Sequence, residues 1–382
     1  MALIRRHLQT VLREHMFRGK AILLLGARQV GKSTLMRQIL EDETLGVPPG
    51  KILSLDCDDV ETRNALRDAT LEDVRRLVAD NQIVFVDEAQ RVPGVGLTLK
   101  MIVDHFPKTQ LLVTGSSSFL LQGKLNEPLT GRKFEYRLYP VSTQELRENG
   151  GDLLARRTLE SRLVYGSYPD VLTGADDARE ILMNLSGSYM YQDLLALEGI
   201  RKPAVLEKLL TALALQIGGE VSWNELAQTA GTDPRTAEKY VDLLEKCHVV
   251  FRLNALSRNL RSELKKSRKI YFHDNGIRNA VIRNLNPLSM RQDVGALWEN
   301  FLVGERLKRN HYNGRYANAY FWRTTSQSEI DYVEEADGKF DAFEMKWNPK
   351  KAGTKLPSAF ASAYPVGETG VVTSENYLDW VG

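Results

Sequence analysis

Eight residues near the beginning of the chain have the types and the spacing of a phosphate-binding loop. Gly26-Ala-Arg-Gln-Val-Gly-Lys-Ser33 fits the pattern G-x-x-x-x-G-K-[ST], with an apolar run before it and a helical stretch, 33–40, after it. The glycines let consecutive N–H groups face a phosphate, and the helix N-terminus adds the positive end of its dipole. Lys32 is expected to reach the β- and γ-phosphates, and the Ser33 hydroxyl to hold Mg²⁺. We predict that the nucleotide is bound by Gly26, Ala27, Arg28, Gln29, Val30, Gly31, Lys32, Ser33 and Thr34.

Two acidic residues, Asp87 and Glu88, end the apolar run QIVFVDE. Asp87, at the carboxyl end of the predicted strand, is expected beside Mg²⁺. Glu88 can orient and deprotonate a water that attacks the γ-phosphate, which is the work of a general base. The alternative is a charged pair that merely ends a strand. Together with the phosphate loop the pair predicts hydrolysis, and since the sequence has no N-K-x-D motif for reading guanine, ATP is the favoured nucleotide.

Three other residues are expected to act on the same phosphate. The next apolar run ends in Thr114-Gly-Ser-Ser-Ser118, where Thr114 or Ser116 could sense the γ-phosphate. A cap for a helix that starts near Phe119 explains these hydroxyls equally well. Arg132 precedes the last run of this part, and from one subunit it could reach the γ-phosphate held by the next, where it would offset transition-state charge. The alternative for Arg132 is a solvated surface side chain.

The elements that must position these residues are buried strands separated by helices. Unbroken apolar runs are typical of strands buried on both faces, and the helical stretches between them imply parallel crossovers. We therefore predict an α/β fold with a doubly wound parallel sheet, which ends at the turn-rich break 149–152. The runs are 21–26, 51–56, 82–88, 110–115 and 133–140.

The middle of the chain has the pattern of a winged helix. Residues 221–230 and 235–247 read as two helices joined by a turn, in which Asp233 can cap the second helix. Two extended segments follow and flank a basic stretch suited to phosphate contact. The alternatives are a protein-docking module and a merely solvated basic turn. The candidate DNA-binding residues are Arg258, Arg261, Lys265, Lys266, Arg268 and Lys269.

Acidic residues near the end resemble the PD-(D/E)xK nuclease arrangement. Asp331 stands on one predicted strand, and Glu344 and Lys346 stand on the next, where alternation points them to one face. Two carboxylates could hold Mg²⁺ while the lysine aligns water, and Glu299 of a preceding helix often joins this cluster in similar folds. The proline of the nominal motif is absent. The alternative is a charge network in a nuclease-like fold that serves only binding.

Composition narrows the setting of the protein. The chain of 382 residues has 51 Lys and Arg against 49 Asp and Glu, which argues against coating nucleic acid by bulk charge. Cys57 and Cys247 are too few for a disulfide framework, so a reducing cytoplasm is expected. No apolar run approaches the roughly 18 residues of a membrane span. The basic first 20 residues faintly resemble a transit peptide, but an amphipathic helix packed on the first domain is favoured.

The motifs GARQVGKSTL, VFVDEAQ, VTGSSSFLL, LTGRKFEYRLYPVSTQEL and YGSYPDVL resemble the AAA-type ATPases of bacteria and archaea in which an uncharacterised C-terminal domain follows the ATPase core. The resemblance covers nearly the whole chain. It implies an AAA+ core, assembly into a homo-oligomeric ring, expected to be a hexamer, and a role for Arg132 as a finger acting across subunits. No chemistry is assigned to Arg28 and Gln29.

We expect an ATPase core at 1–150, a helical connector at 151–210, a winged helix at 211–275 and a nuclease-like α/β domain at 285–382. The favoured function is Mg²⁺-dependent ATP hydrolysis by an oligomer that binds and remodels DNA, with branched or junction DNA among the candidate substrates. One alternative is an ATP-controlled switch that recruits protein partners without DNA chemistry. Another is an ATP-gated nuclease in defence.

Overall fold

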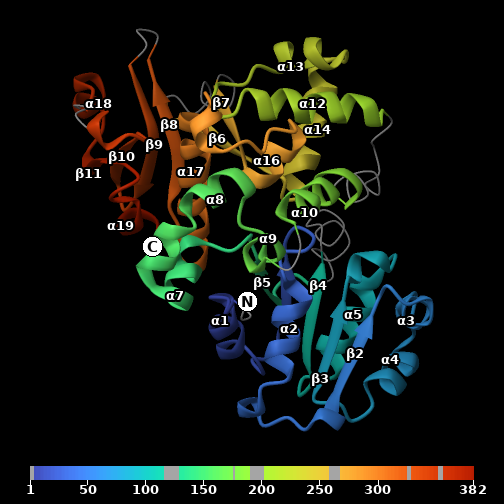
Figure 1. Cartoon of the computed structure of the whole chain (residues 1–382). Coiled ribbons are helices and arrows are strands. Elements are labelled where there is room, and N and C mark those ends of the chain that lie inside the picture. The colour runs from blue at the N-terminus through green and yellow to red at the C-terminus, as the bar shows by residue number, and fades with distance from the viewer. Residues whose placement is uncertain are drawn as a thin grey trace. The chain divides into compact units, whose positions relative to one another are not determined.

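The computed structural model describes residues 4–115, 129–174, 177–189, 202–257, 267–324, 328–351 and 356–382. The chain divides into two compact units. The first unit is Arg5–Tyr139 with Lys246–His248, and the second unit is Met1–Ile4, Pro140–Glu245 and Val249–Gly382. Each is described by itself below, and Figure 1 labels their elements.

The first unit is built on a five-stranded sheet in the order β2-β3-β4-β1-β5. All of its neighbouring strands run parallel, so the doubly wound parallel sheet predicted from the sequence is confirmed. The carboxyl ends of β1, β3 and β4 meet at one edge, because Leu25 is level with Gly115 and Val86 with Val113. The strands are β1 (Ala21–Leu25), β2 (Ile52–Asp56), β3 (Ile83–Asp87), β4 (Gln110–Gly115) and β5 (Lys133–Arg137).

Helices cover both faces of this sheet, with α2 on one face and α3 to α5 on the other (Figure 1). Right-handed crossovers between parallel strands produce this distribution. The N-terminal helix packs on α2 through a buried apolar stripe that includes Leu8 and Leu12, as the amphipathic interpretation of the first residues predicts. The helices are α1 (Leu8–Glu14), α2 (Lys32–Leu40), α3 (Val60–Leu66), α4 (Leu71–Val78) and α5 (Val95–His105).

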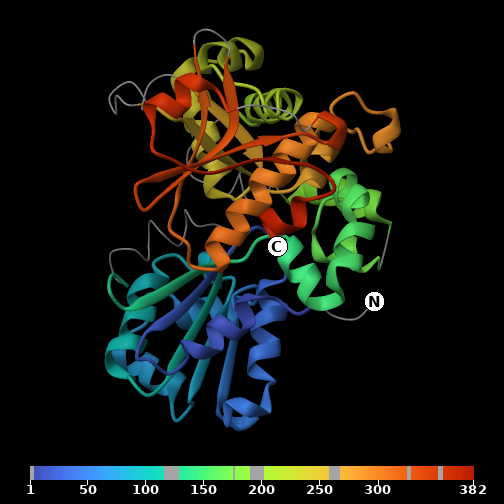
Figure 2. The same ribbon diagram turned by 90° about the vertical axis from the view of Figure 1, so that its left-hand side faces the viewer.

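The second unit surrounds a six-stranded mixed sheet in the order β11-β10-β9-β8-β6-β7. The long helix α17 (Val294–Tyr312) packs on strands of this sheet and is drawn in orange in Figure 2. Its buried Trp298 lies in an aromatic core with Phe301 and Tyr377. The strands are β6 (Val250–Ala255), β7 (Arg268–Phe272), β8 (Asn318–Arg323), β9 (Glu329–Ala336), β10 (Lys339–Met345) and β11 (Val366–Val372).

Most helices of this unit precede the sheet in the chain, as the periodicity up to residue 250 predicts. They are α7 (Thr143–Arg157), α8 (Leu159–Tyr165), α9 (Pro169–Thr173), α10 (Ala178–Asn184), α12 (Pro203–Leu215), α13 (Trp223–Ala230) and α14 (Pro234–Lys246). Three further helices follow later in the chain, namely α16 (Asn275–Val281), α18 (Ser358–Ala363) and α19 (Tyr377–Val381). None of the helices within the described ranges has the length and apolar character that crossing a bilayer requires.

The break predicted at 149–152 is a kink within a helix, and the domain bounds expected from the sequence stay predictions. The turn-rich stretch 149–152 lies inside α7, where Gly151 has φ 69° and kinks the helix, and the first unit already ends at Tyr139. Glycine tolerates this left-handed conformation, so a kink there does not require a domain boundary.

The hairpin of the expected winged helix is part of a larger sheet. Strand β6 pairs antiparallel with β7 and parallel with β8, so the hairpin and the C-terminal strands form one sheet. The turn between α13 and α14 is present, and Asp233 accepts a hydrogen bond from the Thr236 backbone N–H, as predicted for a cap. Since the basic stretch 258–266 lies outside the described residues, the winged-helix layout stays a prediction.

Candidate functional site

The loop between β1 and α2 curves tightly because glycine stands at its two ends. A Cβ atom on Gly26 would lie 2.3 Å from the Leu138 carbonyl oxygen, so no other residue fits there without a shift of backbone. Gly31, immediately before α2, has φ 93°, and Gln29 also adopts a left-handed conformation at φ 58°. Turns that contain left-handed residues can form concave backbone sites that bind anions.

Lys32 lies inside the curve of this loop. Lys32 is 4% exposed, and its Nζ donates to the carbonyl oxygens of Gly26 (3.1 Å) and Ala27 (2.9 Å). The ammonium is therefore held where a phosphate in the loop would meet it. Of the other predicted loop residues, Val30 is buried, Arg28 is half-buried, and Gln29 and Thr34 are exposed.

A hydroxyl and a carboxylate face each other where β3 ends and α2 begins. Ser33 Oγ donates to Asp87 Oδ1 at 3.0 Å, although 54 positions separate the two residues in the chain. One hydroxyl and one carboxylate suit Mg²⁺, which usually takes few protein ligands and completes its shell with waters and substrate phosphates. The donor set therefore fits the ion, and bound Mg²⁺ would neutralise charge on the phosphates.

Glu88 is held in a left-handed conformation, with φ 52° and ψ 41°. Its backbone N–H donates to Thr114 Oγ1 (3.1 Å) and lies 3.2 Å from Asp87 Oδ1. Its carboxylate accepts a hydrogen bond from the Gln90 amide, a partner that sequence analysis missed because nothing in the local pattern marks it. A non-glycine residue in this conformation is costly and is typical of functional sites.

Thr114 contacts both members of the acidic pair. The residue is fully buried, and its hydroxyl donates to the Asp87 carboxylate while it accepts from the Glu88 backbone. The predicted sensing of the γ-phosphate by Thr114 stays a prediction. Ser116 and the helix start near Phe119 lie outside the described residues.

Arg132 lies at the end of the sheet opposite to the phosphate loop. Its neighbour Lys133 is level with Ala21 at the start of β1, whereas the phosphate loop follows the end of that strand. Five residues of strand span roughly 16 Å, which is beyond the reach of an arginine side chain. Arg132 is paired with Asp104 and its side chain is 40% exposed. The phosphate of its own loop is therefore out of its reach, and action across subunits and the alternative of a surface side chain both stay predictions.

A second cluster, in the second unit, unites the C-terminal residues singled out in the sequence. Lys346 Nζ lies 2.8 Å from Glu344 Oε2 and 3.4 Å from Asp331 Oδ2, and the Met345 backbone N–H donates to Asp331. Glu299, from α17, accepts hydrogen bonds from Lys269 Nζ (2.9 Å) and from the Tyr271 hydroxyl (2.6 Å). Tyr271 was not predicted, since it reads as an ordinary core residue of a strand.

The carboxylates of this cluster influence one another. Burial raises the pKa of Glu299, and the nearby Asp331 charge adds to this rise while Lys269 opposes it. Burial and Asp331 likewise raise the pKa of Glu344. Within the described part of the chain, no group of three or more His, Cys, Asp and Glu side chains is arranged to hold a metal. Around Lys346, the cluster offers the two carboxylates of Asp331 and Glu344.

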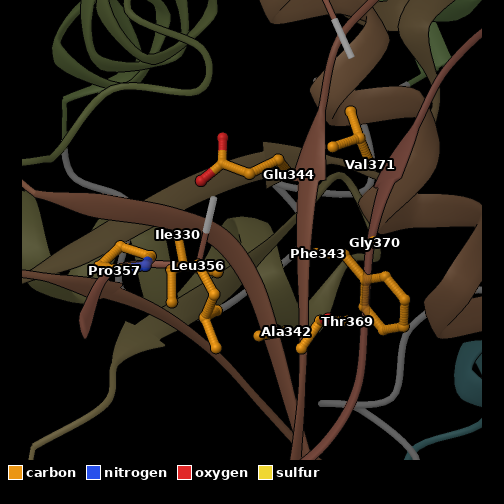
Figure 3. Close-up of a pocket in the computed structure, with 9 residues that line it drawn as sticks. All are labelled: Ile330, Ala342, Phe343, Glu344, Leu356, Pro357, Thr369, Gly370 and Val371. Atoms are coloured by element: carbon orange, nitrogen blue, oxygen red, sulfur yellow. The ribbon is translucent and has the colours of Figure 1, made fainter. Parts of the chain in front are cut away.

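Glu344 also lines a cavity of about 350 Å³. Figure 3 shows its side chain projecting from β10 toward the side on which Leu356 and Pro357 lie. The other walls are Ile330, Ala342, Phe343, Thr369, Gly370 and Val371. An open space adjoins the acidic cluster.

The candidate DNA-binding residues that the structure describes are less exposed than the sequence predicts. Lys269 is 2% exposed and its ammonium is paired with Glu299 and with Glu329 (2.8 Å), which withdraws it from the predicted phosphate contacts. Arg268 lies over the Trp223 ring at 4.5 Å and is 15% exposed. Arg258, Arg261, Lys265 and Lys266 lie outside the described residues.

Comparisons with known families divide the chain into three parts. Residues 18–147 match an AAA domain, residues 156–288 match a domain of unknown function (DUF8612), and residues 294–379 match another domain of unknown function (DUF4143). With its parallel sheet and phosphate loop, the first unit has the fold of the P-loop ATPases.

Individual relatives are distant. An uncharacterized protein of Mycobacterium tuberculosis is 27% identical over 352 residues, which is 91% of this chain and 74% of that protein. An uncharacterized protein of Haemophilus influenzae is 28% identical over 284 residues, or 68% of each chain. The solved structure of the Walker-type ATPase of Pyrococcus abyssi matches with a TM-score of 0.52 at 18% identity, over 73% of this chain and 96% of that chain. The similarity to the Pyrococcus abyssi structure shows the fold alone.

Two substitutions separate the predicted roles of Lys32 and Glu88. Lys32→Ala is expected to weaken nucleotide binding at least tenfold, because a charge-assisted contact to phosphate is lost. Glu88→Gln is expected to leave binding intact and to slow turnover about 100-fold or more, because the general base is removed. Calorimetry with ATP and Mg²⁺ measures the first and phosphate release the second. The exposed Lys108→Ala and Glu41→Gln serve as matched controls, and normal turnover by Glu88→Gln would contradict the assignment.

Proposed function

We propose that this protein is a Mg²⁺-dependent ATPase that works as an oligomer on DNA. The observation that carries the ATPase is the contact between Ser33 and Asp87, with Glu88 fixed beside it at the edge where the phosphate loop lies. These groups have the roles of metal ligand and general base in P-loop hydrolysis. ATP and Mg²⁺ are the implied cofactors.

The proposed DNA substrate rests on the helix–turn–helix of the second unit. Arg235 and Lys239 are exposed on α14, one helical turn apart, where they can meet a phosphate backbone or a groove. The basic stretch 258–266 follows the end of β6 and supplies further positive charge. The alternative is an ATP-controlled switch that recruits protein partners and does not act on DNA.

The deciding experiment is an ATPase assay with single-stranded, duplex and junction DNA, with binding measured across salt concentrations. DNA is expected to raise the rate of phosphate release. Lys265→Ala with Lys266→Ala is expected to reduce the slope of log affinity against log salt by about 2, because the loss of two phosphate contacts means that fewer counterions are released on binding. Lys108→Ala is the control. No stimulation by any DNA, together with a stable protein partner, would favour the switch.

The proposed oligomer rests on the position of Arg132 at the edge away from its own phosphate loop. Arg132→Ala is expected to abolish hydrolysis while it preserves ATP binding, since the finger stabilises only transition-state charge. Mixing Arg132→Ala with Glu88→Gln subunits is expected to restore part of the rate, because some interfaces then pair an intact finger with an intact base. Full activity of Arg132→Ala alone would disprove the assignment.

A Mg²⁺-dependent nuclease is a second candidate activity, favoured by the convergence of Asp331, Glu344 and Lys346. Two carboxylates can hold the ion and the lysine can align water or stabilise charge. Glu344→Ala with Lys346→Ala is expected to abolish DNA scission and to spare ATP hydrolysis. The exposed pair Lys339→Ala and Glu368→Ala is the matched control. Scission that persists in the first variant would exclude this cluster as its source.

A further inference from the structure

A buried arginine outside every motif contacts the phosphate loop. Arg6 is 5% exposed, and its Nη1 donates to the Val30 carbonyl oxygen at 2.7 Å. Val30 stands between two left-handed residues, Gln29 and Gly31. The guanidinium offsets the partial negative charge of this carbonyl oxygen within the loop. Arg6 thus supports the loop without being one of its residues.

The same guanidinium reaches the end of the first unit. Arg6 Nη2 donates to the Tyr139 carbonyl oxygen at 2.6 Å. The adjacent Leu138 backbone N–H donates to the Leu25 carbonyl at 2.7 Å, and the Leu138 carbonyl packs against Gly26. Residues 138 and 139 are therefore fastened to both sides of the phosphate loop, at Leu25 and Gly26 by backbone contacts and at Val30 through Arg6.

The second unit begins at Pro140, directly after these residues, and its first residues are again held by hydrogen bonds. The Val141 backbone N–H donates to the Ser167 carbonyl at 2.8 Å, and that of Thr143 donates to the Glu305 carboxylate. Glu305 is buried with Arg162 and Lys308, whose charges lower its pKa to about 2 although burial opposes this shift. A buried ionic network of this kind resists displacement, because separating its members leaves unpaired charge.

From these contacts we propose that Arg6 is a positioning residue that couples the phosphate loop to the linker 138–143. Through this coupling, a change of bound nucleotide alters the hydrogen bonding of the linker. The proposal rests on the nucleotide binding proposed above. The guanidinium suits the task because its planar fork holds two carbonyl oxygens in fixed directions. A lysine ammonium lacks that geometry.

The test compares the full chain with Arg6→Met, Arg6→Lys and, as a matched control, the exposed neighbour Arg5→Met. Binding of a fluorescent ADP analogue with Mg²⁺ gives the affinity. Hydrogen exchange, with and without saturating ADP and Mg²⁺, follows two peptides, 26–35 and 138–146. The amides of Leu138, Val141, Ser142 and Thr143 are all hydrogen-bonded and report on the linker.

In the wild-type chain and in Arg5→Met, nucleotide is expected to slow exchange in both peptides. Arg6→Met is expected to bind about tenfold more weakly, since a charged donor is lost, and at saturation to protect 26–35 but no longer 138–146. Arg6→Lys, which keeps a buried cation, is expected to fold like the wild type and to recover only part of the linker response. Thermal unfolding verifies that each variant is folded.

A linker response in Arg6→Met equal to that of the wild type would overturn the coupling, and so would a wild-type linker that ignores nucleotide while the loop is protected. In both cases the nucleotide site itself would stand. Absence of nucleotide binding by the folded wild-type chain would instead overturn the proposed function, and the coupling with it.

Discussion

The backbone of the phosphate loop is the constraint on which the first unit depends. Its curve requires a residue without a side chain at Gly26, where the Leu138 carbonyl oxygen fills the space, and a left-handed residue at Gly31. These conformations are maintained by neighbours from other parts of the chain. The strand β5, which carries Leu138 beyond its end, is therefore as necessary to the loop as the residues of the loop itself.

Around this loop, hydroxyl groups contact the acidic pair. Asp87 accepts from Ser33 and Thr114, and Glu88 is fixed through its backbone. A carboxylate has lone pairs beyond those that hydroxyls occupy, and these can accept from water or bind a metal ion.

In the second unit, by contrast, carboxylates are paired with cations, and the extent of burial differs from pair to pair. Glu299 is paired with Lys269, Glu344 with Lys346, and Glu305 with Lys308. Buried charges are tolerated when each has a partner of opposite sign and further hydrogen bonds. In the cluster around Asp331, Lys346 is shared by Asp331 and Glu344, and Glu344 extends toward an adjoining cavity of about 350 Å³.

Local patterns in the sequence were sufficient for the parallel sheet, the phosphate loop and the approach of Glu344 to Lys346, because buried strands, glycine-dependent turns and strand alternation are properties of short segments. Tertiary structure alone decided the burial of Lys269, the contact of Tyr271 with Glu299, the inclusion of the β6–β7 hairpin in the C-terminal sheet, and the reach of Arg6 to Val30 and Tyr139. Each of these joins residues that are distant in the chain, and the periodicity of a single segment carries no information about which distant group will meet it.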